Sequence, residues 1–275
     1  MTISLLMACM RVDQSNVGLL GVVADIAQRF SAAVVGVVAT QPSMRSVITA
    51  AGPGAPPNRD VERFRERAAA LEEEFRAALR VAQTLQWRSQ MTAGPPSLHI
   101  ANDARGVDLI VVAAEAGERR FPPSTEIDVS DLLMRAGRPV LIAPAQAAEL
   151  KLRRALVCWK DSREARRAVV DALPILRVCR QVDVVELANG RELEAARDHL
   201  ADLAEWFGRH GVETNCLALP LNGSEAAHLA ALAADRDVDL IVAGAFGRSR
   251  MSEWVFGGVT QDLLLNSDRC VLVSH

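Results

Sequence analysis

The sequence predicts an α/β protein made of two tandem, doubly wound, five-stranded parallel-sheet domains. The first reason is an internal repeat: "VDLIVVAA" at 107–114 returns as "VDLIVAGA" at 238–245, and "RPVLIAP" at 138–144 returns as "RCVLVSH" at 269–275, with the same offset. The second reason is that short apolar runs alternate with longer segments of helical period. Runs that are apolar on both faces are typical of parallel strands covered by helices.

In the second copy, each short apolar run predicts a strand. The expected strands are "ALVCW", "VDVVEL", "VETNCLAL", "VDLIVAG" and "CVLVS", at 155–159, 182–187, 212–219, 238–244 and 270–274. The expected helices occupy 162–179, 191–210, 225–235 and 259–267. Pro174 has no backbone N–H and clashes with the preceding turn, so we expect the first of these helices to end or bend at Leu173.

The first copy follows the same order. Its expected strands lie at 3–10, 33–39, 86–92, 107–113 and 139–143, and a long helix is expected from Asp60 to about Val81, after the Pro/Gly-rich loop "TAAGPGAPPN". The copies meet near "APAQAAELK" at 143–151. We therefore expect one domain over residues 1–146 and a second over residues 152–275.

Composition limits the function. The 275 residues are 50% apolar and 24% charged, with a net charge of -3, so no basic surface for nucleic acid or anionic membrane is indicated. No apolar run approaches the roughly 20 residues of a membrane span, and we expect a cytoplasmic protein. The five cysteines are odd in number and widely spaced, and the histidines show no ligand spacing, so we expect neither disulfides nor a metal site.

A glycine-rich stretch, "GAFGRSRMSEWVFGG" at 244–258, follows the strand "VDLIVA" in the second copy. Ligands of open parallel sheets bind outside the carboxyl ends of the strands. The helix expected after Gly257 or Gly258 would begin with unpaired N–H groups, which suit a phosphate. Arg248, Ser249 and Thr260 could add donors. Glycines that only shape the connection are the alternative interpretation.

The spacing Gly-x-x-Gly, nine residues, then Gly resembles the signature of the universal stress protein family, with Gly244, Gly247 and Gly257 as its three glycines. The resemblance is strong over Arg154–His275 and looser over Ile3–Pro144. It implies the universal stress protein fold, also described as adenine-nucleotide alpha-hydrolase-like. It further implies that ATP or a related adenine nucleotide, ADP or AMP, could bind, with or without Mg.

The family pattern differs from this chain at two positions. Gly258 stands where Ser or Thr is usual, and Lys160 in "CWKDS" occupies the place of an acidic residue that contacts the nucleoside. Asp161, one place later, could serve instead, or Lys160 could contact phosphate directly. Trp159, which ends the strand, could wall an adenine pocket or cap the core.

The first copy lacks the glycines. At the repeat offset, Ala113, Ala116, Glu126 and Ile127 stand opposite Gly244, Gly247, Gly257 and Gly258. Glu126 would place a carboxylate near the phosphate. We therefore expect no such nucleotide site in the first half.

Three functions remain open. The first is a tandem universal stress protein, a stress-response regulatory module whose second half binds an adenine nucleotide. The second is a dimerising scaffold or partner-binding protein of the same fold that binds no nucleotide. The third is an adenine-nucleotide-dependent hydrolase or transferase. We rank it last because no nucleophile elbow, Walker motif or general base is present, so we expect at most weak ATP hydrolysis.

The resemblance also implies a dimer, because members of the universal stress protein family are often dimeric. Two domains in one chain could imitate it internally, as a pseudo-dimer, by pairing the apolar edge strands "PVLIA" and "CVLVS". A homodimer of whole chains is the alternative.

Overall fold

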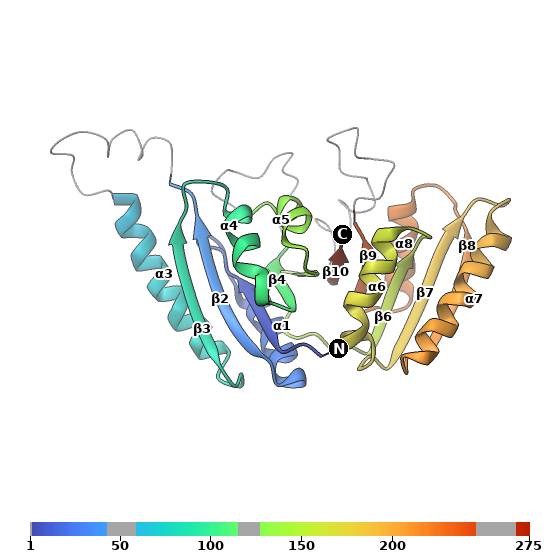
Figure 1. The fold of residues 1–275 in the computed structure, drawn as a ribbon, viewed down its shortest axis with the longest axis horizontal. Coiled ribbons are helices and arrows are strands. Elements are labelled where there is room, and N and C mark those ends of the chain that lie inside the picture. The colour runs from blue at the N-terminus through green and yellow to red at the C-terminus, as the bar shows by residue number, and fades with distance from the viewer. Residues whose placement is uncertain (1, 43–58, 115–126, 246–267) are drawn as a thin grey trace.

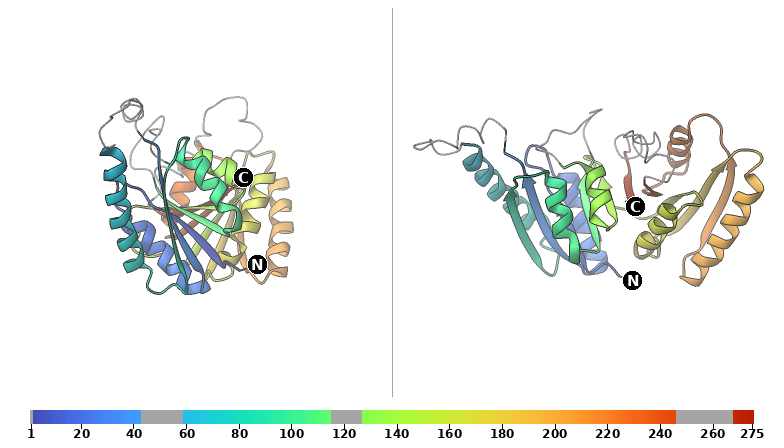
Figure 2. Two further views of the ribbon diagram at one scale, coloured as in Figure 1. Left: turned by 60° about the vertical axis from the view of Figure 1, so that its left-hand side comes forward. Right: turned by 45° about the horizontal axis from the view of Figure 1, so that its top comes forward.

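The fold was analysed in a computed structural model, which describes residues 2–42, 59–114, 127–245 and 268–275. Ten strands form one sheet in the order β3-β2-β1-β4-β5-β10-β9-β6-β7-β8. Read outward from β5 and from β10, the two halves have the same strand order, as the internal repeat predicts. Figure 1 shows the halves side by side, with the C-terminus between them, and the right-hand view of Figure 2 shows the same.

The strands fall where the apolar runs predict them. In the first half they are β1 (Leu5–Cys9), β2 (Ala33–Thr40), β3 (Leu85–Met91), β4 (Leu109–Ala113) and β5 (Val140–Ala143). In the second half they are β6 (Arg154–Trp159), β7 (Gln181–Ala188), β8 (Thr214–Pro220), β9 (Leu240–Gly244) and β10 (Cys270–Ser274).

Helices cover both faces of the sheet, so its central strands are buried on each side. One face carries α1 (Val17–Phe30), α3 (Arg59–Ala78), α6 (Arg163–Leu176) and α7 (Leu193–Arg209). The other carries α4 (Pro96–Asp103), α5 (Val129–Ala136) and α8 (Glu225–Asp235), with a 3-10 turn, η1 (Ala104–Gly106), after α4. This layering explains the uninterrupted apolar runs of the central strands.

The halves join through the antiparallel pair β5–β10. Val271 lies opposite Ile142, Leu272 opposite Leu141, and Val273 opposite Val140. The other strand pairs are parallel. The predicted pairing of "PVLIA" with "CVLVS" is confirmed, and it buries the inner edge of each half.

The repeated "VD" dipeptide has the same structural role in both halves. Asp108 Oδ2 accepts hydrogen bonds from the backbone N–H groups of Ser4 (2.7 Å) and Leu5 (3.0 Å), where β1 begins. Asp239 Oδ2 accepts from those of Arg153 (2.8 Å) and Arg154 (3.0 Å), where β6 begins. Each aspartate therefore satisfies two donors at the start of the first strand of its half.

The segment between the halves packs on α1. A Cβ atom on Gly18 would lie 2.4 Å from the carbonyl oxygen of Pro144, and one on Gly21 would lie 2.3 Å from that of Ala148. These glycines therefore let the connecting backbone run directly across the helix.

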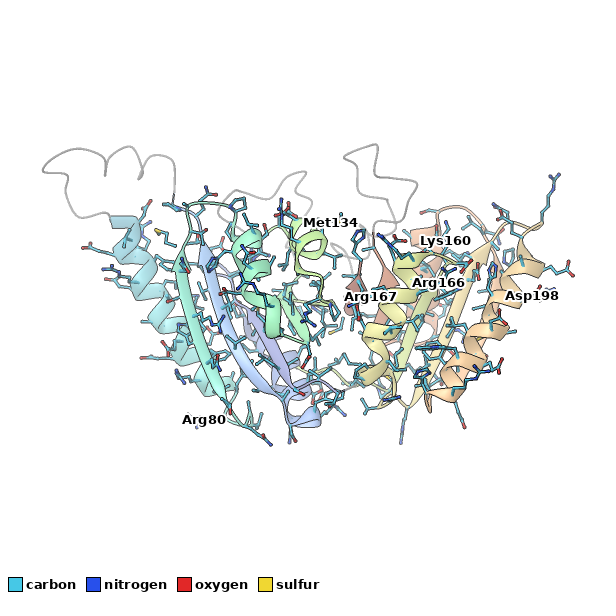
Figure 3. All side chains as sticks on the ribbon, in the orientation of Figure 1. Arg80, Met134, Lys160, Arg166, Arg167 and Asp198 are labelled. Atoms are coloured by element: carbon cyan, nitrogen blue, oxygen red, sulfur yellow. The ribbon has the colours of Figure 1, made fainter. Side chains whose placement is uncertain are left out.

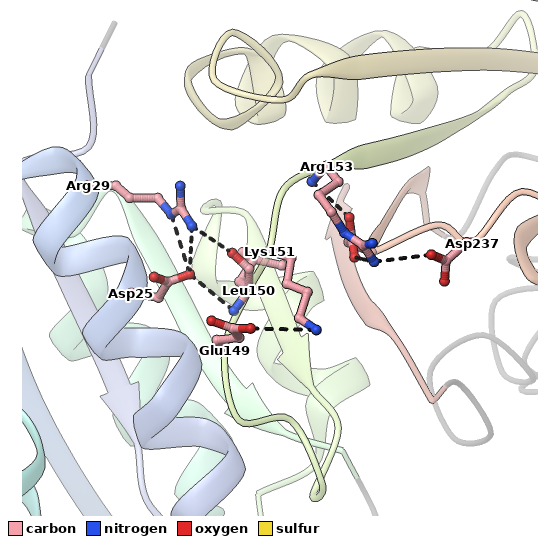
Figure 4. Close-up of polar contacts among 8 residues, drawn as sticks. Asp25, Arg29, Glu149, Leu150, Lys151, Arg153 and Asp237 are labelled. Carbon is pink, nitrogen blue, oxygen red and sulfur yellow. Dashed lines mark hydrogen bonds and ion pairs between the residues drawn. The ribbon is translucent and has the colours of Figure 1, made fainter.

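Polar contacts hold the end of the connection (Figure 4). Asp25 on α1 accepts a hydrogen bond from the backbone N–H of Leu150 at 3.1 Å, and Arg29 donates to the Leu150 carbonyl oxygen at 3.4 Å. Beyond it, Arg153 forms ion pairs with Asp237 and Asp239. The predicted domain limits at 146 and 152 lie within this connection and stay a prediction.

Pro174 does not end its helix at Leu173, so that part of the prediction is wrong. Helix α6 continues to Leu176, with Pro174 inside it. The proline lies in the last turn, and the backbone N–H of Arg177 still bonds the carbonyl oxygen of Leu173 at 3.1 Å. Burial of Ile175 and Leu176 in the core offsets the lost hydrogen bond.

Among the described residues, no helix is long and apolar enough to cross a membrane.

Candidate functional site

The candidate site lies where the strand order reverses, between β6 and β9. Cys158 pairs with Ala243, and one step further this register places Trp159 beside Gly244 at the carboxyl ends of both strands. Helix α6 covers one face of the sheet next to this edge, and Ala245, which follows Gly244, is buried on the other face. Open parallel sheets bind ligands at such a switch point.

Gly244 has a packing reason for being glycine. A Cβ atom there would lie 2.5 Å from the backbone N of Ala165 and 2.5 Å from the carbonyl carbon of Glu164. The first turn of α6 thus rests directly on the end of β9. Ser162 caps that turn, because its Oγ accepts a hydrogen bond from the N–H of Ala165 at 3.2 Å. The glycine therefore brings the start of α6 to the switch point.

Lys160 and Asp161, which the sequence leaves as alternatives, have different surroundings. The Asp161 carboxylate pairs with the Arg166 guanidinium of α6. Within the described residues, Lys160 forms no ion pair; it is exposed, and Figure 3 labels it near Arg166 on the second half. Its charge is therefore available beside the start of α6, whereas Asp161 already has a cationic partner.

Sequence reasoning missed a buried carboxylate. Glu186, near the end of β7, lies opposite Trp159 in the β6–β7 register, and its residue is only 7% exposed. One carboxylate oxygen, Oε1, lies 3.2 Å from Nδ1 of His199 on α7. An acidic residue inside the apolar run "VDVVEL" is the signal that could have identified it.

Two polar atoms at this edge are buried without partners. Within the described part of the chain, neither Nε1 of Trp159 nor Oε2 of Glu186 has a hydrogen-bond partner. Native proteins leave few buried polar atoms unpaired, and each such atom needs an explanation. Because Trp159 and Glu186 are register partners on adjacent strands, their indole N–H donor and carboxylate acceptor form a pair that a ligand with the opposite pattern could satisfy.

The remaining predicted ligand residues lie outside the described residues. They are Gly247, Arg248, Ser249, Gly257, Gly258 and Thr260. In the first half, Ala116 and Glu126 also lie outside, whereas Ala113 ends β4 and Ile127 is buried. The structure therefore brings together Trp159, Lys160, Asp161 and Gly244 of the predicted set.

The cysteines are free thiols. Burial raises the pKa of Cys158, beside the site, to about 12, which disfavours the thiolate needed for nucleophilic chemistry. Among the described residues, no group of three or more His, Cys, Asp or Glu side chains could hold a metal ion.

Comparison with known proteins gives the family of the second half. The sequence pattern of the universal stress protein family matches residues 151–275. Residues 151–275 are therefore a universal stress protein domain. None of the curated proteins compared matches the chain in sequence.

Solved universal stress proteins share the fold of the whole chain. One from Archaeoglobus fulgidus DSM 4304 is 14% identical, with a TM-score of 0.75 over 98% of this chain and 97% of its own. A putative one from Pseudomonas aeruginosa UCBPP-PA14 is 17% identical, with a TM-score of 0.61 over 99% of this chain and 93% of its own. The predicted fold, with two tandem universal stress protein units, is confirmed.

The buried carboxylate of this universal stress protein domain makes the stability of the chain depend on pH. Burial raises the pKa of Glu186 above its ordinary value of 4.5, although His199 and the charge of Lys160 oppose the shift; the charge of Asp161 adds to it. The folded state therefore binds a proton at Glu186 more tightly than the unfolded state does. The resulting stabilisation is complete below pH 4.5 and is lost as the pH rises through the higher pKa of the folded protein.

We expect Glu186→Gln to unfold at a higher temperature than the wild type at pH 7 to 8, with the difference shrinking as the pH approaches 4.5. Thermal unfolding across this range measures it. Glu205→Gln is the control, because Glu205 pairs with Arg209 on the exposed surface of α7. A Glu186→Gln difference that stays constant with pH would show that the carboxylate is not destabilised by burial.

Proposed function

We propose that the second half binds an adenine nucleotide at the carboxyl edge of β6 and β9, and that the chain is a stress-response regulatory module. The observation that carries the proposal is the pair of unpartnered buried atoms, Trp159 Nε1 and Glu186 Oε2, at the strand-order switch. The open parallel sheet provides the location of a ligand site at its switch point, and the Trp159–Glu186 pair provides hydrogen-bonding groups that a ligand would satisfy.

The N-terminus of α6 is suited to bind phosphate next to this pair. Its first N–H groups point toward the switch edge, the helix dipole favours negative charge there, and Lys160 adds a cation. We infer that the phosphates lie between Lys160 and the predicted contacts Gly247, Gly257 and Thr260. ATP, ADP or AMP, with or without Mg, would meet this description.

The first half supplies no matching site in this proposal. Its edge strand β5 instead pairs with β10, and we infer that this internal pseudo-dimer replaces the pairing of two chains. We further propose a cytoplasmic protein.

Lys160→Glu should weaken ATP binding by about 10- to 100-fold, because a charge-assisted contact to phosphate is replaced by repulsion. Isothermal titration calorimetry measures the change. Arg80→Glu is a matched control: it makes the same charge change on an exposed residue of the first half, at the opposite end of the sheet (Figure 3). The control should bind ATP as the wild type does.

Native purification provides the direct test. Protein purified without added nucleotide and then denatured should release ATP, ADP or AMP, detectable by mass spectrometry, and millimolar ATP should raise the unfolding temperature. An empty wild-type protein with no thermal shift would contradict nucleotide binding and favour the scaffold hypothesis.

A further inference from the structure

A row of side chains crosses the second half at the carboxyl end of its sheet. Ser274 pairs with Gly244, Gly244 lies beside Trp159, and Trp159 pairs with Glu186. The alternation of buried side chains along the strands places this row on the face covered by α6 and α7. Ser274 Oγ, Trp159 Nε1 and Glu186 Oε2 are all buried without a hydrogen-bond partner in the described part of the chain.

The first half contains the same row with no polar side chain. Its strand register gives Ala143 beside Ala113, then Met10, then Val38, and all four belong to the hydrophobic core. The fold can therefore fill this row with apolar side chains. The polar row of the second half costs stability that the first half does not lose, because unpaired buried polar atoms forgo their hydrogen bonds with water.

The chemistry of the Trp159–Glu186 pair defines what would recover those bonds. The indole N–H can only donate, and the ionised carboxylate can only accept. A complementary ligand therefore presents an acceptor beside a donor. Adenine does so on one edge, where the exocyclic 6-amino group lies next to a ring nitrogen.

We propose that Glu186 Oε2 accepts a hydrogen bond from the 6-amino group of the bound base and that Trp159 Nε1 donates to the neighbouring ring nitrogen. The proposal rests on the proposed nucleotide site and adds the residues that select its base. Ser274 lies beyond Gly244, two strands from Trp159, and takes no part in this contact.

The surroundings of Glu186 determine that its carboxylate faces the 6-amino group and that the Trp159 indole faces the ring nitrogen. His199 Nδ1 lies 3.2 Å from Oε1, so that oxygen is engaged and Oε2 remains. The phosphates, anchored near Lys160 and the start of α6, prevent the base from sliding to exchange its donor and acceptor. A 6-oxo base would then set a carbonyl oxygen against the carboxylate and an N–H against the indole N–H. Such mismatches leave buried groups unpaired and are strongly selected against.

Titration with ATP and with inosine triphosphate tests the proposal. These probes differ in the 6-amino or 6-oxo group and in the protonation of the neighbouring ring nitrogen. The wild type should bind ATP about 10- to 100-fold more tightly. In Glu186→Gln the side-chain amide can donate to the 6-oxo group, so the preference should vanish or reverse. Asp198→Asn makes the same change on the exposed surface of α7 and should keep the wild-type preference (Figure 3).

A second variant tests the same contact with substitutions that should leave the fold intact. Trp159→Met combined with Glu186→Val installs the two residues that already fill these positions in the first half. It should fold, as judged by circular dichroism and cooperative thermal unfolding, and should bind ATP and inosine triphosphate equally and more weakly than the wild type binds ATP.

The outcomes separate the two proposals. A wild type that binds neither triphosphate contradicts the proposed function. A wild type that binds both equally, or a Glu186→Gln variant that keeps the full preference for ATP, overturns the base-reading pair while nucleotide binding stands.

Discussion

Replacing Leu272 with alanine should lower the free energy of unfolding by about 2 to 5 kcal/mol, the range for removing a large aliphatic side chain from a packed core. Leu272 is fully buried on β10, where it lies opposite Leu141 of β5. Its loss removes packing from the only described strand pair that joins the halves. Urea denaturation followed by circular dichroism measures the change, and a second unfolding transition would show that the halves have become uncoupled.

A double-mutant cycle makes this test specific to the junction. Leu141→Ala should cost a similar amount, and the combined variant should differ from the sum of the two by about 0.5 to 3 kcal/mol, because the residues are direct neighbours. Val170→Ala is a surface control, since Val170 is 38% exposed on α6. Strict additivity of Leu141→Ala and Leu272→Ala would contradict an energetic coupling across β5–β10.

The second large effect is expected at Gly244. Gly→Ala often stabilises a protein by about 0.4 to 1 kcal/mol, because alanine restricts the unfolded chain. At Gly244 the sign should reverse, with a cost of about 1 to 3 kcal/mol. The new Cβ would lie 2.5 Å from the backbone N of Ala165, so either α6 or β9 must move. Chemical denaturation gives the free energy.

Gly208→Ala provides the matched comparison in the same half. Gly208 lies inside α7, and a Cβ atom there would meet nothing within 4 Å. This change should stabilise the protein by about 0.5 to 1 kcal/mol. If both variants were stabilised alike, the close approach of α6 to β9 would not limit this position.

The fold could be predicted largely because its signals are local. Each apolar run sits where a strand forms, and α8 occupies Glu225–Asp235, the range that its helical period predicts. The repeat then fixes the order of elements in both halves. Helix ends were less predictable: burial of Ile175 and Leu176 carries α6 past a proline that local rules treat as a break.

The site was only partly predictable because its members are distant in the sequence. Trp159 and Gly244 were expected at the strand ends, since strand ends can be read from apolar runs. Glu186 was not, because its meaning depends on its register with Trp159 and on a contact with His199. Likewise, nothing in the local sequence shows that Asp161 pairs with Arg166 across the first turn of α6.

The β5–β10 pair also affects how the chain is made. Ribosomes release the chain from its N-terminus, so β5 is complete roughly 130 residues before β10 emerges, several seconds to tens of seconds at typical elongation rates. During that interval "VLIA" of β5 can pair with β4 on one side, but the edge that later meets β10 has no partner from its own chain. An unpaired apolar strand edge invites pairing with a neighbouring nascent chain. On crowded polysomes, neighbouring nascent chains therefore compete with β10 for pairing with β5. The short length of β5 limits this intermolecular pairing.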